Sequence, residues 1–281
     1  MLRIGITGTE NSHVDHFIRH LNVEQRHDGC RVVALAGGDT ERNRTLAATG
    51  EISDVVDSAA ELVGRVDALI VSNRDGRQHR ENAVPLLEAG AHVFVDKPIA
   101  VSVADTEAII AAARKGGGVL ASWSPLRLTA DVEEVRTEAA KLGAPQLISV
   151  VGPANPDDPH AGLFFYGPHV VEPALEILGN SDPGEVHVEQ GDDVVTATVR
   201  AGDAFVALTF IRPADAKRVP WHITVASRNG VMSREIQLDA DYNARGLSRF
   251  IEAARTGTPP MPYEHLLPPV RILAAITEQL R

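Results

Sequence analysis

Short β-branched segments alternate with segments of helical period over the first 121 residues. Val14, Phe17, Ile18 and Leu21 recur at the spacing of one helix face. A second predicted helix ends at Gly90, and a third, over residues 102–115, ends at a run of three glycines. The strands are predicted over residues 4–6, 31–36, 67–71, 91–95 and 119–121. Strands separated by helices predict a Rossmann-like, doubly wound parallel sheet with helices on both faces.

The pattern changes near residue 122. Turn residues, such as Asp203 and the pair Asn229 and Gly230, now separate strand-like runs with few helices between them. Strands are predicted over residues 147–151, 186–190, 193–200, 204–211, 221–227 and 231–238, and helices over 173–178, 246–255 and 269–280. The sequence therefore predicts two domains, an α/β domain over residues 1–121 and an α+β domain with a mostly antiparallel sheet over residues 122–281.

Composition narrows the function classes. Lys and Arg number 27 and Asp and Glu 38, so the formal charge of −11 disfavours nucleic-acid binding. Cys30 is the single cysteine, which precludes an internal disulfide and favours the cytoplasm. The chain enters a strand pattern at once, so we expect no signal peptide, and no apolar run approaches the ~18 residues that would indicate a membrane span.

The turn after the first strand has the context of a phosphate-binding loop. A strand, a tight turn and a helix start present backbone amides to an anion, which predicts that Gly8, Thr9, Asn11 and Ser12 bind NAD or NADP. Two glycines of the usual G-x-G-x-x-G pattern are replaced, by Glu10 and His13. The alternative interpretation is a plain strand–turn–helix unit in which Ser12 is the N-cap.

The end of the second strand predicts the contacts of the ribose. Asp39 follows that strand by three residues and would hydrogen-bond ribose hydroxyls if the loop bends back. Arg42 and Arg44 would instead meet the 2′-phosphate of NADP. The choice between NAD and NADP stays open, with the acidic surroundings favouring NAD.

The fourth strand ends in Asp96, Lys97 and Pro98. A lysine at the carboxyl end of a parallel strand lies where α/β sheets bind ligands, and partial burial there favours proton exchange near neutral pH. The alternative for Lys97 is an ion-paired strand end without a chemical role.

Four segments resemble one family. Residues 66–98 contain a strand, a helix start with His79, a Leu-Glu-Ala-Gly helix end and the Asp-Lys-Pro sequence. Residues 122–128, 163–179 and 247–260 resemble further segments of the same pattern. Together they resemble the family of glucose–fructose oxidoreductase, inositol dehydrogenase and MocA (Gfo/Idh/MocA). In this pattern Asp96 stands for the more usual Glu.

The resemblance implies an NAD(P)-dependent oxidoreductase that acts on a sugar, polyol or related hydroxy compound. It implies that Lys97 and His169 are catalytic and that the protein is a homo-oligomer, a dimer or tetramer. The family's acid four residues before the histidine is replaced by Phe165. Further implied contacts are Ser72, Asn73, His79 and Asp96 on the cofactor side and Arg127, Tyr166 and Glu172 on the substrate side.

Two alternatives stay open beside the dehydrogenase. The first is a redox-silent binding or regulatory protein, which Glu10, Gly37 and Phe165 favour. The second is a lyase that uses bound nucleotide without net redox change. His13, His16 and His20 share a helix face, but no further ligand completes a zinc set, so we expect no metal.

Overall fold

The structure is a computed structural model that describes residues 1–179, 183–214 and 219–280. It contains two compact units, which are described separately. The first unit consists of Met1–Ala100, Ala104–Trp123 and Asn243–Tyr263. The second consists of Val101–Val103, Ser124–Tyr242 and Glu264–Arg281. A segment from the last fifth of the chain therefore belongs to the first unit.

The first unit is built on a six-stranded sheet in the order β3-β2-β1-β4-β5-β6. All five neighbouring strand pairs are parallel, as predicted. The strands are β1 (Leu2–Thr7), β2 (Cys30–Ala36), β3 (Asp54–Val56), β4 (Ala68–Val71), β5 (His92–Asp96) and β6 (Leu120–Trp123). Every residue of β4 is buried, because helices cover both faces of a sheet of this type.

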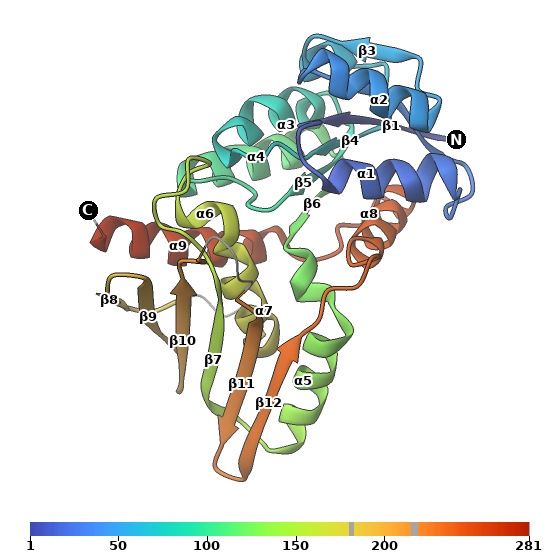
Figure 1. Cartoon of the computed structure of the whole chain (residues 1–281). Helices are drawn as coiled ribbons and strands as arrows, with labels where there is room; N and C mark the ends of the chain where they lie inside the picture. Colours follow the sequence, from blue (N-terminus) through green and yellow to red (C-terminus); the bar gives the residue numbers. More distant parts are fainter. Residues whose placement is uncertain (180–182, 215–218, 281) are drawn as a thin grey trace. The chain divides into compact units, whose positions relative to one another are not determined.

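Helices cover both faces of this sheet. In Figure 1, α3 and α4 lie on one side of it and α1 and α8 on the other. The helices are α1 (His13–Ile18), which continues as the π-helical segment η1 (Arg19–Val23), α2 (Thr40–Gly50), α3 (His79–Glu88), α4 (Val103–Gly116) and α8 (Ala244–Thr256). Short 3-10 turns are η2 (Ala59–Leu62) and η3 (Gly76–Gln78). The doubly wound architecture is confirmed.

The second unit contains a six-stranded mixed sheet in the order β12-β11-β7-β10-β9-β8. Four of its pairs are antiparallel, and only β7 and β10 run parallel. The strands are β7 (Pro145–Pro153), β8 (Val186–Gln190), β9 (Val194–Ala201), β10 (Ala204–Ile211), β11 (Trp221–Ser227) and β12 (Gly230–Ile236). The mostly antiparallel sheet is therefore confirmed.

Helices cover one face of this second sheet. Inward side chains alternate with less buried ones along β9, β10 and β11, which is the signature of a sheet that is covered on one side. Large apolar side chains of this sheet remain exposed, among them Phe205 of β10 and Val231 of β12. The helical elements are α5 (Ala130–Lys141), α6 (Leu163–Tyr166), α7 (Pro168–Leu178), α9 (Leu267–Gln279), η4 (Pro125–Leu128) and η5 (Tyr263–Leu266).

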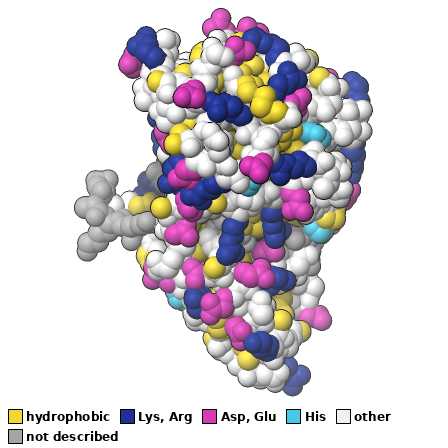
Figure 2. Space-filling view, turned by 90° about the vertical axis from the view of Figure 1, so that its right-hand side faces the viewer, with side chains coloured by type: hydrophobic (Ala, Val, Ile, Leu, Met, Phe, Trp, Pro, Cys, Tyr) yellow, Lys and Arg dark blue, Asp and Glu magenta, His cyan; other side chains and the backbone are white. Residues whose placement is uncertain are grey.

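The surface carries charged side chains of both signs, as expected from a sequence rich in Asp, Glu, Lys and Arg. On the face shown in Figure 2, Lys and Arg side chains are interspersed with Asp and Glu. Among the described residues, none of the helices has the length and apolar character that a bilayer crossing requires.

Several short or amphipathic elements were not expected from the sequence. Helix α2 is mostly polar, strand β3 has only three residues, and α5 carries a narrow apolar stripe. These elements gain their stability from packing beside longer neighbours rather than from a strong local pattern. The helix predicted from residue 173 begins five residues earlier, at Pro168, which occupies a favourable first-turn position.

Candidate active site

The turn after β1 requires a glycine. Gly8 has a φ angle of +80°, and a Cβ atom there would lie 2.0 Å from the backbone nitrogen of Asn73. At the start of α1, Asn11 rather than Ser12 satisfies the backbone, since its side-chain oxygen accepts from the amide of His13 (3.0 Å). Ser12 stands at the N-cap position, but its hydroxyl makes no capping hydrogen bond. The N-cap alternative for Ser12 therefore lacks its contact, and the exposed hydroxyl is available to a ligand.

Glu10 is held by the neighbouring loop. Its carboxylate accepts a hydrogen bond from the backbone amide of Arg74 (2.9 Å), which follows β4. The carboxylate of Glu10 in the turn after β1 therefore has a hydrogen-bond partner in the loop after β4.

The turn after β2 combines a capped helix with unsatisfied oxygens. Asp39 is the N-cap of α2 and accepts from the amide of Arg42 (2.8 Å). The Oγ1 atom of Thr9 and the Oδ1 atom of Asn43 are buried without a hydrogen-bond partner among the described residues. Both lie near Gly38, where a Cβ would come within 2.2 Å of Thr9 Oγ1. Such buried oxygens mark places where water or a ligand hydroxyl binds.

Both arginines of this region already have anionic partners. The guanidinium of Arg42 donates to the backbone oxygen of Thr9 (3.0 Å) and to the carboxylate of Asp15. Arg44 pairs with Glu41. A 2′-phosphate would therefore have to compete with these carboxylates for either arginine.

Asp96 is the centre of a buried network at the end of β5. One carboxylate oxygen lies 2.6 Å from Nδ1 of His13 and accepts from the hydroxyl of Ser72 (3.0 Å). The other oxygen accepts from the amide of Lys97 (2.9 Å). Burial alone would raise the pKa of Asp96, but the charge and hydrogen bond of His13, the Lys97 charge and the Ser72 hydroxyl together hold that pKa well below its usual range. Asp96 is therefore ionised at neutral pH.

His79 links two loops beside this network. Its Nδ1 atom lies 2.6 Å from the backbone oxygen of Pro98, and its Nε2 atom lies 2.9 Å from that of Asn73. Burial lowers the pKa of His79, while the two carbonyl contacts oppose that change. The ring of His79 therefore links Pro98, which directly follows Lys97, to the loop after β4.

His169 of the second unit is oriented by a serine. The hydroxyl of Ser124 lies 2.7 Å from Nδ1 of His169, and both residues are buried. Glu172 accepts from the amide of Ser124 (2.8 Å). The contact with Ser124 at Nδ1 therefore sets the orientation of the His169 ring.

Arg127 is committed to acidic residues of α7. Its Nε donates to Glu176 (2.6 Å), and its Nη1 lies 3.9 Å from Glu172; Arg127 and Glu172 are buried, and Glu176 is partly exposed. The substrate role of Arg127 and Glu172 stays a prediction, and their contacts show that both hold the start of the second unit against α7.

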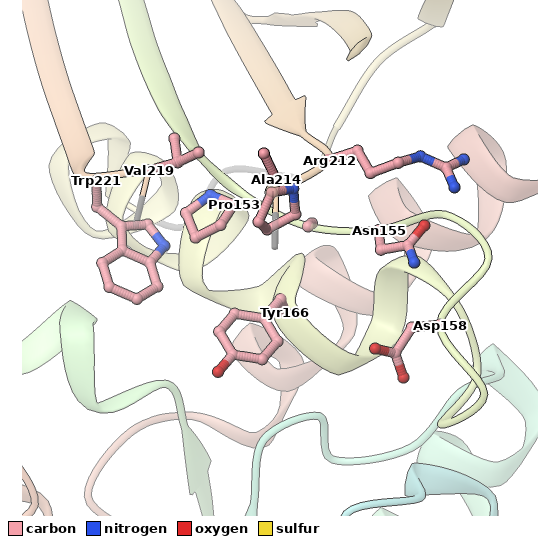
Figure 3. Close-up of a pocket in the computed structure, with 10 residues that line it drawn as sticks. Pro153, Asn155, Asp158, Tyr166, Arg212, Ala214, Val219 and Trp221 are labelled. Carbon is pink, nitrogen blue, oxygen red and sulfur yellow. The ribbon is translucent and has the colours of Figure 1, made fainter. Parts of the chain in front are cut away.

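A pocket of about 600 Å³ lies in the second unit, beside the C-terminal ends of β7 and β10. Its lining includes Tyr166, Trp221, Asn155 and Asp158, and Figure 3 shows the Tyr166 and Trp221 rings side by side along it. Their planes are parallel within 5°, with 6.4 Å between centroids. The ring of His169 meets both edge to face, at 5.4 and 5.7 Å. Aromatic surface beside carboxylate and amide groups suits a sugar or polyol, which presents C–H faces and hydroxyls.

Comparisons with known proteins identify the first unit. Residues 2–123 match the model of the family described as "Oxidoreductase family, NAD-binding Rossmann fold". Residues 2–123 are therefore similar to the Gfo/Idh/MocA oxidoreductase family. The predicted resemblance to Gfo/Idh/MocA proteins and the NAD(P)-binding Rossmann domain are thereby confirmed.

Curated relatives of the Gfo/Idh/MocA type cover part of the chain. It is 35% identical to 1,5-anhydro-D-fructose reductase of Ensifer adhaerens over 124 residues, which are 43% of this chain and 37% of that protein. It is 29% identical to inositol 2-dehydrogenase 3 of Saccharopolyspora erythraea over 169 residues, 58% of this chain and 48% of that protein. The match thus spans less than half the length of either relative.

Solved Gfo/Idh/MocA-like structures share the whole fold. The myo-inositol 2-dehydrogenase of Lactobacillus plantarum superposes with a TM-score of 0.83 at 13% identity, over 98% of this chain and 97% of that one. GenD2 from gentamicin A biosynthesis, solved in complex with NAD, gives 0.83 at 17% identity, over 98% and 92%. At these identities the likeness establishes the fold of both units.

The sequence did not predict three features of this candidate site. Ser124 was not considered as the partner of His169, because the two lie 45 positions apart. Trp221 was taken only as a strand residue. His13 was read as a disruption of the glycine pattern, although it contacts Asp96, 83 positions away. Only the local Ser124-Pro125 cap offered a signal, since a serine before a proline is typical of a helix start.

The residue four positions before His169 is apolar in this chain. Phe165 packs on His160, with 4.9 Å between ring centroids, and places an apolar ring where the Gfo/Idh/MocA pattern has an acid. Within the described residues, no group of three or more His, Cys, Asp or Glu side chains is placed to hold a metal ion.

Proposed function

We propose that this protein is an NAD(P)-dependent oxidoreductase acting on a sugar, polyol or related hydroxy compound. The observation that carries the proposal is the network around Asp96, which fixes Lys97 at the carboxyl end of a parallel strand. In sheets of this type ligands bind at that edge. The match to an NAD-binding Rossmann family and the names of the relatives, an anhydrofructose reductase and an inositol dehydrogenase, support it.

We assign the nucleotide to residues 1–121 and the substrate to residues 122–281. Gly8, Thr9, Asn11 and Ser12 hold the diphosphate, and Asp39 lies at the ribose. Ser72, Asn73, His79 and Asp96 shape the turns beside the nicotinamide. The bound nucleotide supplies a hydride acceptor or donor.

Lys97 and His169 carry the proton chemistry of the proposed reaction. Lys97 binds the substrate hydroxyl and stabilises the developing negative charge on its oxygen. His169, oriented by Ser124, accepts the hydroxyl proton. Tyr166 binds the substrate beside His169, and Arg127 and Glu172 hold the segment that carries Ser124.

The proposal is tested by nucleotide binding and turnover. Calorimetric titration with NAD, NADH, NADP and NADPH should give binding in the micromolar range for at least one nucleotide. Lys97→Met and His169→Ala should leave that binding within about 3-fold but lower turnover by about 10²–10⁴-fold on the active compound of a sugar and polyol panel. Lys115→Met and His187→Ala are matched controls, because both side chains are largely exposed. Absence of binding at millimolar nucleotide would refute the proposal.

We propose that NAD is preferred over NADP. Asp39 places a carboxylate at the ribose side, and Arg42 and Arg44 are engaged by Asp15 and Glu41. A 2′-phosphate would meet net negative charge there. We expect NAD to bind at least about 10-fold more tightly than NADP, and Asp39→Asn to reduce that ratio. Equal affinities would contradict the assignment.

The redox-silent alternative rests on Phe165. A binding protein has no need for an acid at this position, and the Phe165 ring packs against His160 and Tyr166 instead. This alternative predicts that nucleotide or sugar binds without turnover of any panel compound. A lyase would instead release product without change in the absorbance of the reduced nicotinamide.

We propose a homo-oligomer, a dimer or tetramer, in the cytoplasm, without nucleic-acid partners. The open face of the second sheet exposes Phe205 (47%) and Val231 (67%), which suits a subunit interface. The net charge of −11 argues against nucleic acid, and the single Cys30 favours a reducing compartment. Light scattering after size exclusion tests the assembly, and Phe205→Asp should shift it towards monomer.

A further inference from the structure

Two departures from the expected sequence pattern are in contact. His13 stands where the glycine pattern has its third glycine, and Asp96 stands where the family pattern has Glu. Nδ1 of His13 lies 2.6 Å from Oδ2 of Asp96, and the side chains are only 11% and 2% exposed. Departures that are 83 positions apart in the chain thus form one buried pair.

The ionised state of Asp96 determines which atom of the pair carries the shared hydrogen. An ionised carboxylate only accepts hydrogen bonds, so Nδ1 of His13 carries the hydrogen in this contact. Oδ2 of Asp96 also accepts from Ser72, and Oδ1 accepts from the amide of Lys97. Loss of one of these donors would leave the desolvation cost of the buried carboxylate less well compensated. The donors therefore hold the end of β5 in one arrangement.

We propose that His13 is a positioning residue for Lys97 and acts through Asp96. This inference rests on the proposed function, in which Lys97 binds the reacting hydroxyl. His13 begins α1 directly after the predicted diphosphate turn, and Lys97 follows β5. The pair therefore ties the reactive lysine to the loop that holds the cofactor.

Three titratable side chains are recorded near the pair. Lys97 acts on Asp96, His16 lies one turn along α1 from His13, and His79 lies near Asp96 and Lys97. Removal of His13 leaves the negative charge of Asp96 less compensated beside the Lys97 amine. The amine should then hold its proton more tightly.

The short contact limits the length of the side chain that position 96 can carry. Glu is one methylene longer than Asp, and with His13 only 2.6 Å away a longer side chain at position 96 has no room to extend. A glycine at position 13 frees that room. We therefore expect His13→Gly and Asp96→Glu each to impair the site, and the double variant to recover most of the loss.

The decisive experiment observes Lys97 in the full-length protein without ligand. The chain has four lysines, Lys97, Lys115, Lys141 and Lys217, so reductive ¹³C-methylation gives few signals, and Lys97→Arg assigns the one of interest. In His13→Ala the titration midpoint of the Lys97 signal should rise by about 0.5–2 pH units. His13→Asn, which keeps a donor of similar reach, should recover part of the shift. His16→Ala, on the same helix, is the matched control and should change it by less than about 0.2 units.

Kinetics and binding complete the test. His13→Ala should leave the NAD dissociation constant within about 3-fold and lower kcat by about 10²-fold, because small displacements of a reacting group have effects of this size. An unchanged Lys97 titration in His13→Ala and His13→Asn, with only thermal stability altered, would overturn the proposal and make His13 a structural residue. If His13→Ala does not fold, His13→Asn decides alone by the same titration. Failure of the wild-type protein to bind NAD would refute the proposed function without touching the Lys97 titration.

Discussion

Substitution of Gly8 by alanine tests the turn on which the nucleotide site depends. A Cβ atom at this position would lie 2.0 Å from Asn73 N and 2.3 Å from the carbonyl carbon of Ser72. Ordinary contact begins near 3.4 Å, so the turn or the loop after β4 must move by about 3.4 − 2.0 = 1.4 Å. The three nearest atoms are backbone atoms of Ser72 and Asn73, so no flexible side chain can absorb this shift.

The expected cost has two parts. A non-glycine residue at a φ of +80° costs about 1–2 kcal/mol, and relief of the overlap adds about 1–3 kcal/mol. Gly8→Ala should therefore lose about 2–5 kcal/mol of stability, less than the total stability of most domains. Displacement of the turn by more than 1 Å should also weaken NAD binding by about 10²-fold.

Gly64→Ala is the matched control. Gly64 has a similar φ of +74°, but a Cβ there meets no atom within 4 Å, so only the backbone cost of about 1–2 kcal/mol remains. Urea unfolding measures the stabilities, and calorimetry measures NAD affinity. Equal losses of stability in the two variants, with NAD affinity preserved in Gly8→Ala, would refute the reasoning.

Three further outcomes are expected. Ser124→Ala should lower kcat by about 10-fold with NAD affinity unchanged, because His169 loses the hydroxyl that orients its ring; an unaltered kcat would exclude that role. The folded-state pKa of Asp96 lies below the unfolded value of about 3.9, so its contribution to stability is complete above that pH and is lost as the pH falls towards the folded pKa. Asp96→Asn should therefore flatten the acid limb of stability measured by urea unfolding between about pH 2 and 7. Phe165→Asp should raise turnover if the protein is a weakened dehydrogenase, and a fall would indicate that the Phe165 ring packs on the substrate.

Local patterns in the sequence determined most of the elements. The parallel sheet followed from buried β-branched runs between helical segments, and the hairpin from β9 to β10 followed from its alternation around Asp203. Lys97 was placed at a strand end for the same reason, since a strand that reads as buried must end at the sheet edge. Short-range periodicity carries this information because it reflects which side of an element faces a core.

Only the tertiary structure decided which distant residues meet. The parallel pairing of β7 with β10, the inclusion of α8 in the first unit and the contacts of His169 with Ser124 are not encoded in any local spacing. The same holds for His13 and Asp96. In the sequence His13 weakened the nucleotide interpretation, whereas in the folded chain it supplies a partner to a buried carboxylate. The contact between His13 and Asp96 matters energetically because both side chains are buried. They become buried only when the sheet brings the ends of β1 and β5 to one edge.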